Sequence, residues 1–168
     1  DNMMMNLNVL EAARRTNVKK VVSFLSTCVF PAKVEYPLTE DKLHDGEPHF
    51  SNYGYAYAKR MLDVQARAYN DQYGVSQSET GLMSFNGKYV SVVPTNIYGP
   101  NDNFELGNSH VVPALIHKCY LAKQQGLDFM VWGSGLPLRE FIYADDVGDL
   151  TQQILESYED AAPLILSN

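Results

Sequence analysis

The stretch KKVVSFLSTC, residues 19–28, decides the fold of this chain. Its residues 19–25 place four large apolar side chains within the last five positions, a pattern typical of strands that are buried in a parallel sheet. The polar triplet Ser26-Thr27-Cys28 follows directly. Because parallel sheets bind ligands at the carboxyl ends of their strands, the stretch predicts a buried strand that ends in a polar site.

Strand and helix patterns alternate on both sides of this stretch. Further strands are expected at residues 89–94, 129–132, 139–143 and 164–166. Helices are expected at about residues 3–16, 51–73, 109–123 and 145–158. This alternation predicts an α/β fold with a mainly parallel sheet.

Two segments interrupt the alternation. Residues 31–50 contain Pro, Asp and His and are expected to form a long excursion. Residues 76–87 lengthen a connection between helix and strand for which about two to six residues are usual. We interpret this second segment as an exposed insertion or a misannotated coding segment, without an assigned function.

Composition excludes several classes of protein. The 168 residues are 45% hydrophobic and 20% charged, with a net charge of −7 and no run of Lys or Arg, which argues against a nucleic-acid-binding protein. No apolar run approaches the roughly 20 residues that cross a bilayer, and no secretory signal is present. Cys28 and Cys119 form no disulfide or metal framework, and His44 and His49 lack metal-ligand spacing, so we expect no metal and a cytoplasmic location.

A tyrosine and a lysine stand four residues apart near the start of the helix expected at residues 51–73. On a helix, Tyr55 and Lys59 project from one face, which allows the ammonium to lie beside the phenol. A nearby cation stabilises a phenolate, so the pair suits proton transfer at a carbonyl being reduced or an alcohol being oxidised. Tyr57 points to a different face and is expected to pack. The spacing alone is common, so other motifs must support this interpretation.

Further motifs occur in a fixed order along the chain. They are Ser26-Thr27-Cys28, Pro94-Thr95-Asn96-Ile97-Tyr98-Gly99-Pro100, Asn108-Ser109-His110, Val131-Trp132-Gly133-Ser134-Gly135 and Arg139-Glu140-Phe141-Ile142-Tyr143. Together with the Tyr–Lys pair, this series resembles the GDP-L-fucose synthases, which are the GDP-4-keto-6-deoxymannose 3,5-epimerase-4-reductases among the extended short-chain dehydrogenases/reductases. The resemblance runs along the whole chain except residues 76–87.

The resemblance implies a Rossmann-like doubly wound parallel sheet, of which this chain holds the C-terminal part, and the start of a small substrate-binding domain. Residues 1–108 would belong to the NADP-binding domain. Residues 109–168 would begin the substrate-binding region, interleaved with the last Rossmann elements. The family forms homodimers through helices like the one expected at residues 51–73, so a homodimer is expected of the full-length protein.

The resemblance also implies a division of chemical roles. Cys28 and His110 match the acid and base that epimerise the carbons beside the ketone. Ser26 and Tyr55 would bond the ketone oxygen, and Tyr55 would then give up its proton as hydride arrives from NADPH. Lys59 would assist Tyr55 and bind the nicotinamide ribose.

Binding residues follow from the same resemblance. The cofactor, NADP(H), would be contacted by Phe24, Leu25, Ser26, Thr27, Lys59, Pro94, Thr95, Asn96, Ile97 and His110. Lys118, Trp132 and Arg139 match the contacts to the substrate, GDP-4-keto-6-deoxymannose. Two cations suit a diphosphate, and an aromatic face suits a base or a sugar. Cys119 and His117 are expected to be structural.

One expected motif is missing. NADPH needs a Gly-rich turn at a helix N-terminus to hold its pyrophosphate, and Gly133-Ser134-Gly135 opens no expected helix. In the family this turn precedes the point where the chain begins, so we expect a partial chain that binds NADPH poorly and turns over little. Two alternatives stay open. One is another extended short-chain dehydrogenase acting on nucleotide sugars, a 4-epimerase or dehydratase, in which Cys28 and His110 have no evident role. The other is a non-catalytic remnant of the scaffold, which Ser26, Tyr55 and Lys59 oppose.

Overall fold

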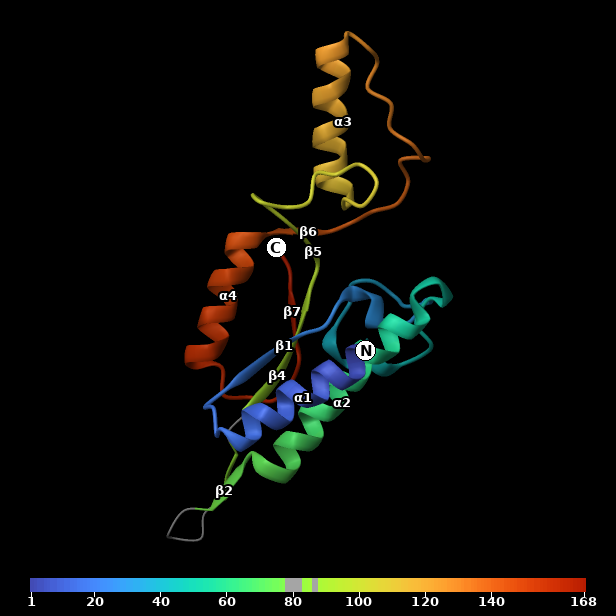
Figure 1. Ribbon diagram of the computed structural model, residues 1–168. Helices are drawn as coiled ribbons and strands as arrows, with labels where there is room; N and C mark the ends of the chain where they lie inside the picture. The colour runs from blue at the N-terminus through green and yellow to red at the C-terminus, as the bar shows by residue number, and fades with distance from the viewer. Residues whose placement is uncertain (78–82, 86–87) are drawn as a thin grey trace.

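A parallel three-stranded sheet forms the centre of the molecule. The computed structural model describes residues 1–77, 83–85 and 88–168. The strands β1 (Val21–Phe24), β4 (Tyr89–Pro94) and β7 (Leu164–Leu166) lie in the order β1-β4-β7, and both pairs are parallel (Figure 1). This arrangement confirms the α/β fold with a parallel sheet.

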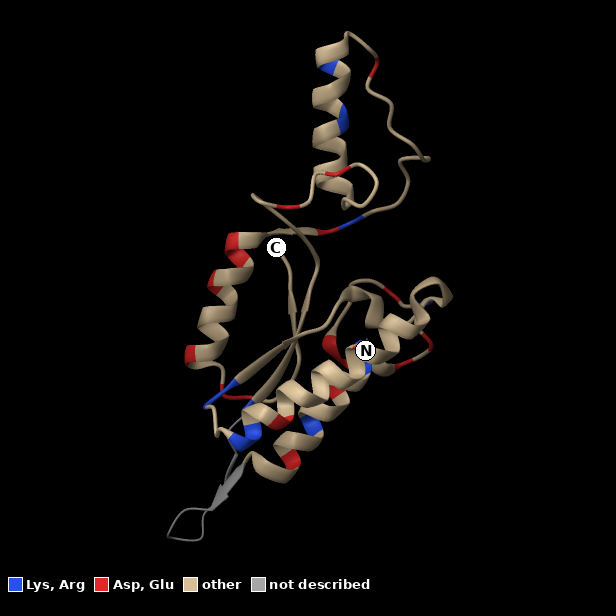
Figure 2. Ribbon diagram, viewed as in Figure 1, with Lys and Arg blue, Asp and Glu red and all other residues tan. Residues whose placement is uncertain are grey.

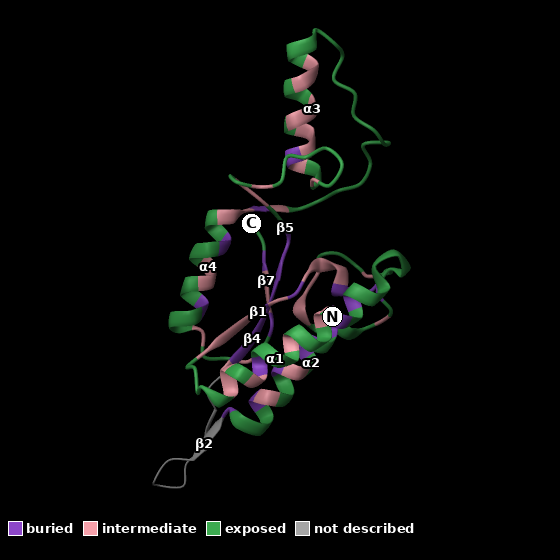
Figure 3. Cartoon of the chain, viewed as in Figure 1, coloured by how far each residue is buried: buried purple, intermediate pink, exposed green. Residues whose placement is uncertain are grey.

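Helices cover both faces of this sheet. Helices α1 (Asn2–Arg15) and α2 (Tyr53–Tyr73) pack on one face, where Leu10 and Leu62 meet Tyr89 and Val93 of β4. Helix α4 (Ala144–Ser157) packs on the other, where Val147 and Ile154 meet Val90 and Val92. Alternate side chains of β4 therefore pack into two separate hydrophobic cores, because successive side chains of a strand point to opposite faces. Figure 3 shows the buried residues concentrated in the sheet and on the inner sides of these helices.

A buried asparagine joins α2 to β4. The side-chain amide of Asn70 donates to the backbone carbonyl of Tyr89 at 2.7 Å, and the backbone N–H of Tyr89 donates to the Asn70 side-chain oxygen at 2.9 Å. Both residues are at most 1% exposed. The pair of bonds satisfies backbone groups at the first residue of β4 that water cannot reach.

A second, smaller pairing lies beyond the carboxyl ends of the central strands. β5 (Asn96–Tyr98) pairs in parallel with β6 (Phe141–Tyr143). Helix α3 (Val111–Gln125) extends away from the central sheet beyond this pair (Figure 1). It ends at Gly126, whose φ of 65° gives the left-handed conformation that suits a helix C-terminus.

Most of the expected elements are confirmed within a few residues, but the strand expected at residues 129–132 is wrong. No strand forms there, and Met130 and Trp132 are 66% and 86% exposed. A strand needs a neighbouring backbone to bond with, and none of the described residues pairs with this segment. Strand β5, in contrast, lies where no strand was expected.

The two interrupting segments differ in how far the structure describes them. The excursion contains one short 3₁₀ helix, η2 (Glu40–His44). A second, η1 (Thr27–Val29), ends just before it, and a third, η3 (Phe50–Asn52), begins at its last residue. In the expected insertion, β2 (Val75–Gln77) and β3 (Met83–Phe85) pair antiparallel, whereas residues 78–82 and 86–87 lie outside the described residues.

The charged residues are unevenly distributed. Acidic side chains follow the length of α4, which contains no Lys or Arg, whereas α1 and α2 carry both signs (Figure 2). In the part of the chain that the structure describes, no helix is both long and apolar enough to pass through a bilayer.

Candidate functional site

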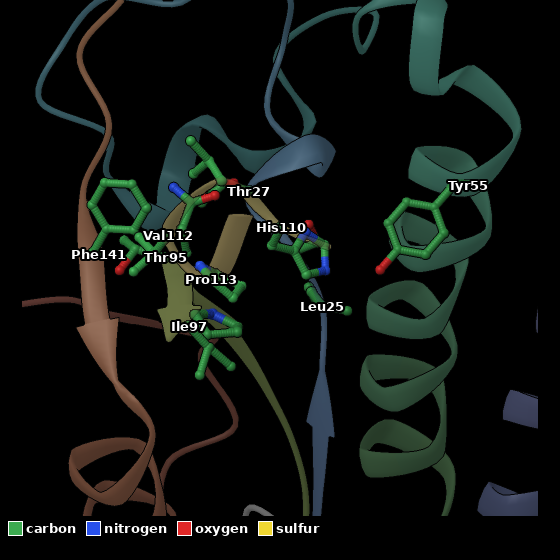
Figure 4. A pocket seen from close by; sticks show the side chains of 13 residues that line it. Leu25, Thr27, Tyr55, Thr95, Ile97, His110, Val112, Pro113 and Phe141 are labelled. Carbon is green, nitrogen blue, oxygen red and sulfur yellow. The ribbon is translucent and has the colours of Figure 1, made fainter. Parts of the chain in front are cut away.

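A cavity of about 300 Å³ lies at the carboxyl ends of β1 and β4. Its walls come from the ends of both strands, from α2, from the start of α3 and from β6 (Figure 4). The lining residues are Leu25, Ser26, Thr27, Tyr55, Pro94, Thr95, Asn96, Ile97, His110, Val111, Val112, Pro113 and Phe141. The position is the one at which parallel sheets bind ligands.

Three of the five catalytic candidates line this cavity. Ser26 follows β1, Tyr55 lies in the first turn of α2, and His110 is the N-cap of α3. Figure 4 shows the Tyr55 side chain reaching from its helix toward His110 and Leu25. Residues as far as 84 positions apart in the chain, Ser26 and His110, are therefore gathered around one cavity by the ends of separate elements.

Most of the expected cofactor contacts line the same cavity. They are Leu25, Ser26, Thr27, Pro94, Thr95, Asn96, Ile97 and His110. Phe24 and Lys59 lie outside the lining. The hydroxyl of Thr95 is buried and has no hydrogen-bond partner among the described residues. An orphaned hydroxyl beside a cavity is a group that a polar ligand can satisfy.

Lys59 lies behind Tyr55 and bonds the strand. Its ammonium donates to the carbonyl oxygen of Phe24 at 2.7 Å and lies 5.8 Å from the centre of the Tyr55 ring. Burial lowers the pKa of Lys59, because the partly desolvated ammonium loses hydration. The expected proximity to Tyr55 is thus a contact with the ring, while the hydrogen bond of the lysine goes to the end of β1.

Cys28 lies in η1, adjacent to the cavity rather than in its lining. Its backbone N–H donates to the Ser26 hydroxyl at 3.4 Å. Its sulfur accepts a hydrogen bond of 3.6 Å from the side-chain amide of Asn52, at the start of α2. The sequence did not indicate Asn52, because 24 residues separate the two partners.

Arg60 is a second residue that the sequence did not indicate. It is 7% exposed, its Nε donates to the Val29 carbonyl at 2.6 Å, and its guanidinium lies 5.6 Å from the centre of the Tyr57 ring. Burial lowers the pKa of Arg60. Lys59 and Arg60 thus hold two carbonyl oxygens, those of Phe24 and Val29, on either side of Ser26-Thr27-Cys28. The sequence signal that could have identified Arg60 is its spacing, which places it on the same face of α2 as the buried Ala56 and Asp63.

The excursion is tied to α2 by an acidic residue. Asp63 is 1% exposed, and its carboxylate lies 2.9 Å from Nε2 of His44 and 2.8 Å from Nε of Arg67. Asp63 and Arg67 belong to α2, whereas His44 belongs to η2. Across the described residues, no group of three His, Cys, Asp or Glu side chains is arranged to hold a metal ion.

A second cavity, of about 250 Å³, lies beside the far part of α3. Lys118 and Trp132 both line it, and the ammonium lies 4.9 Å from the centre of the indole ring. Arg139 lines neither of these two cavities; its guanidinium donates to the carbonyl of Leu138 at 2.8 Å. The structure therefore brings together two of the three expected substrate contacts.

Comparison with known proteins gives consistent matches along the chain. Residues 1–165 match the family model "NAD dependent epimerase/dehydratase family". A GDP-L-fucose synthase of Dictyostelium discoideum is 50% identical over 99% of this chain and 48% of its own length. A probable GDP-L-fucose synthase of Drosophila melanogaster is 44% identical over 99% of this chain and 50% of its own length.

A solved structure gives the same result. A GDP-L-fucose synthetase of Naegleria fowleri, bound to NADP, superposes with a TM-score of 0.85 at 48% identity, over 99% of this chain and 51% of that one. The chain thus spans about half the length of the curated relatives it matches.

Proposed function

The chain belongs to the NAD dependent epimerase/dehydratase family, and from this membership we propose that it is part of an NADPH-dependent epimerase-reductase. The proposed enzyme converts GDP-4-keto-6-deoxy-D-mannose to GDP-L-fucose. The observation that carries the proposal is the cavity lined by Ser26, Tyr55 and His110, with Cys28 beside it. The relatives named GDP-L-fucose synthase support this choice of reaction.

The residues present fit one end of the cofactor. Thr95 offers a buried hydroxyl without a partner among the described residues, and the side chains of Leu25 and Ile97 provide apolar contact surface. A cavity of about 300 Å³ is at the lower limit for ligand sites and suits a nicotinamide and its ribose rather than a whole dinucleotide. NADPH, when bound, supplies the hydride for the reduction. We propose that residues 1–108 belong to its binding domain and that residues 109–168 begin the substrate-binding region.

We assign the epimerisation to Cys28 and His110. Inverting a carbon beside a ketone requires that one group remove its acidic proton and that another return a proton to the opposite face. Cys28 and His110 come from different elements, η1 and the N-cap of α3, which supports their approach from different sides. A thiol and an imidazole are both suited to proton exchange near neutral pH.

We assign the reduction to Tyr55, assisted by Ser26 and Lys59. The hydroxyls of Ser26 and Tyr55 bond the ketone oxygen, which carries negative charge as an enolate during epimerisation and as an alkoxide during reduction. Tyr55 donates its phenolic proton to the ketone oxygen, and the hydride that bound NADPH would supply reduces the ketone carbon, so that an alcohol results. Lys59, 5.8 Å from the Tyr55 ring, offers the compensating positive charge.

The remaining expectations are part of the same proposal. Lys118 and Trp132 bind the nucleotide diphosphate end of the substrate in the second cavity, and Arg139 joins them in the full-length protein. The full-length protein acts as a cytoplasmic homodimer. Large apolar side chains exposed on α1 and α2, among them Met4, Val9 and Tyr53, support a dimer contact through these helices.

The proposal is tested by incubating the full-length protein with GDP-4-keto-6-deoxymannose and NADPH in deuterated water. We expect NADPH oxidation, GDP-L-fucose as product, and solvent deuterium at both carbons that flank the ketone. Oxidation without deuterium would instead indicate a simple 4-reductase, and the absence of both would indicate a non-catalytic scaffold. The 168-residue chain, assayed in parallel, shows how much activity these residues support by themselves.

A further inference from the structure

Asn52 lies at the N-cap of α2 but does not cap the helix with its side chain. Asparagine is favoured at this position because its side-chain oxygen can accept a hydrogen bond from a backbone N–H in the first turn. No such bond forms here. Instead, η3 runs directly into α2, and the Asn52 amide nitrogen donates to Sγ of Cys28 at 3.6 Å. The distinguishing feature of Asn52 is therefore its contact with a cysteine that is distant in the sequence, a local exception of the kind that functional sites show.

The backbone around Cys28 is already fixed by other bonds. The Cys28 N–H donates to the Ser26 hydroxyl at 3.4 Å, and Arg60 holds the carbonyl of Val29 at 2.6 Å. The remaining freedom of the sulfur is rotation about the bond between its α- and β-carbons, which has three staggered positions. The Asn52 amide selects one of them.

We propose that Asn52 is a further positioning residue of the site, which holds the Cys28 sulfur in the orientation needed for proton exchange with the sugar. This inference rests on the function proposed above. An N–H donor also stabilises negative charge on a sulfur that has given up its proton, because hydrogen bonds to charged acceptors are the stronger ones. Asn52 thereby assists the sulfur in accepting and returning a proton.

The position of Asn52 also couples the two halves of the reaction. Asn52 stands three residues before Tyr55, at the beginning of the same helix. One turn of α2 therefore carries the phenol that donates the reductive proton and contacts the sulfur that exchanges protons. The orientation of the sulfur and the position of the phenol therefore depend on the same turn.

The contact itself can be tested by the chemical reactivity of the thiol. In the full-length protein, iodoacetamide alkylation is followed by peptide mass spectrometry at Cys28 and, as an internal reference, at the exposed Cys119. Asn52→Asp keeps the size and the capping ability of the residue but cannot donate, and Asn52→Leu removes the donor without adding charge. We expect both variants to slow alkylation of Cys28 by about tenfold and to leave Cys119 unchanged. An unchanged Cys28 rate, or an equal slowing at both cysteines, would overturn the inference.

The catalytic consequence is measured on the same variants. Asn52→Asp is expected to reduce deuterium uptake by the sugar about tenfold while KM for the keto sugar stays unchanged. Gln153→Glu, the same amide-to-carboxylate change at an exposed position of α4, is the matched control and should leave uptake unchanged. If Asn52→Asp raises KM and leaves the uptake rate at saturation intact, Asn52 is not a positioning residue. If the wild-type protein shows no turnover, the proposed function fails, while the alkylation rates still decide whether Asn52 controls Cys28.

Discussion

The ammonium of Lys59 donates a hydrogen bond of 2.7 Å to the carbonyl oxygen of Phe24, the last residue of β1. The N–H groups of Val21 and Leu25 donate to the carbonyls of Lys88 and Val92 on the β4 side, so by the alternation of a strand the Phe24 carbonyl points to the other side of β1. Lys59 thus satisfies a backbone group that β4 cannot reach. The same lysine contacts the Tyr55 ring and therefore connects the strand end to the proposed proton donor.

Replacing this lysine should affect catalysis far more than stability. For Lys59→Met in the full-length protein, we predict a loss in kcat of about 10²–10⁴-fold, the usual range for a disrupted acid–base group. The free energy of unfolding should fall by only about 1 kcal/mol, since one hydrogen bond is lost while a partly desolvated charge is removed. Steady-state kinetics and urea unfolding measure the two quantities. A large loss of stability with an equal loss of soluble active protein would show that Lys59 is mainly structural.

Asn70 should be the opposite case, important for stability and remote from the chemistry. Asn70→Ala leaves both the N–H and the carbonyl of Tyr89 buried without partners, so we predict a loss of roughly 2–5 kcal/mol in the free energy of unfolding. Asn8→Ala, on an exposed position of α1, is the matched control and should change stability by less than about 0.5 kcal/mol. Equal values for the two variants in urea unfolding would contradict the role given to Asn70.

The ion pairs of Glu11 with Arg14 and Arg15 should make the stability of the protein depend on pH. Hydrogen bonds from Arg14 and then Arg15 lower the pKa of Glu11 from its ordinary 4.5 to about 2. A carboxyl whose pKa is lowered in the folded state contributes stability that is present above pH 4.5 and is lost as the pH falls toward 2. The difference in unfolding free energy between the wild type and Glu11→Gln should shrink over this interval. Added salt should reduce the difference at neutral pH, and a difference constant from pH 6 to about 2 would refute this account.

The fold could be predicted from the sequence where an element carries its own apolar pattern. Residues 19–25 and 89–94 are apolar because β1 and β4 lie in the middle of the molecule, and helical spacing defines α1, α2, α3 and α4. The strand expected at residues 129–132 is wrong because apolar side chains do not make a strand without a backbone to pair with. β5 was missed because its exposed residues lie between Pro94 and Gly99, which indicate a loop.

The site could be predicted only where its residues follow recognisable elements. Ser26 and Tyr55 were predicted as site residues because Ser26 follows a strand and Tyr55 lies near the start of a helix. The structure brings both to one cavity with His110. Neither Asn52 nor Arg60 belongs to a sequence motif, because each acts through a contact that is distant in the sequence. Asn52 contacts Cys28, 24 positions earlier, and Arg60 contacts Val29, 31 positions earlier. Arg139 was grouped with Lys118 and Trp132 by resemblance, and its contacts in the described residues are elsewhere.

We propose that one site holds two separable sets of proton-handling groups, Cys28 with His110 for epimerisation and Tyr55 with Lys59 for reduction. The most direct test measures solvent deuterium uptake and NADPH oxidation side by side for Cys28→Ser and Tyr55→Phe in the full-length protein. We predict that Cys28→Ser loses deuterium uptake but keeps some direct reduction of the keto sugar. Tyr55→Phe should lose reduction but keep part of the uptake, because Ser26 still bonds the enolate oxygen. Equal loss of both activities in each variant would contradict the account.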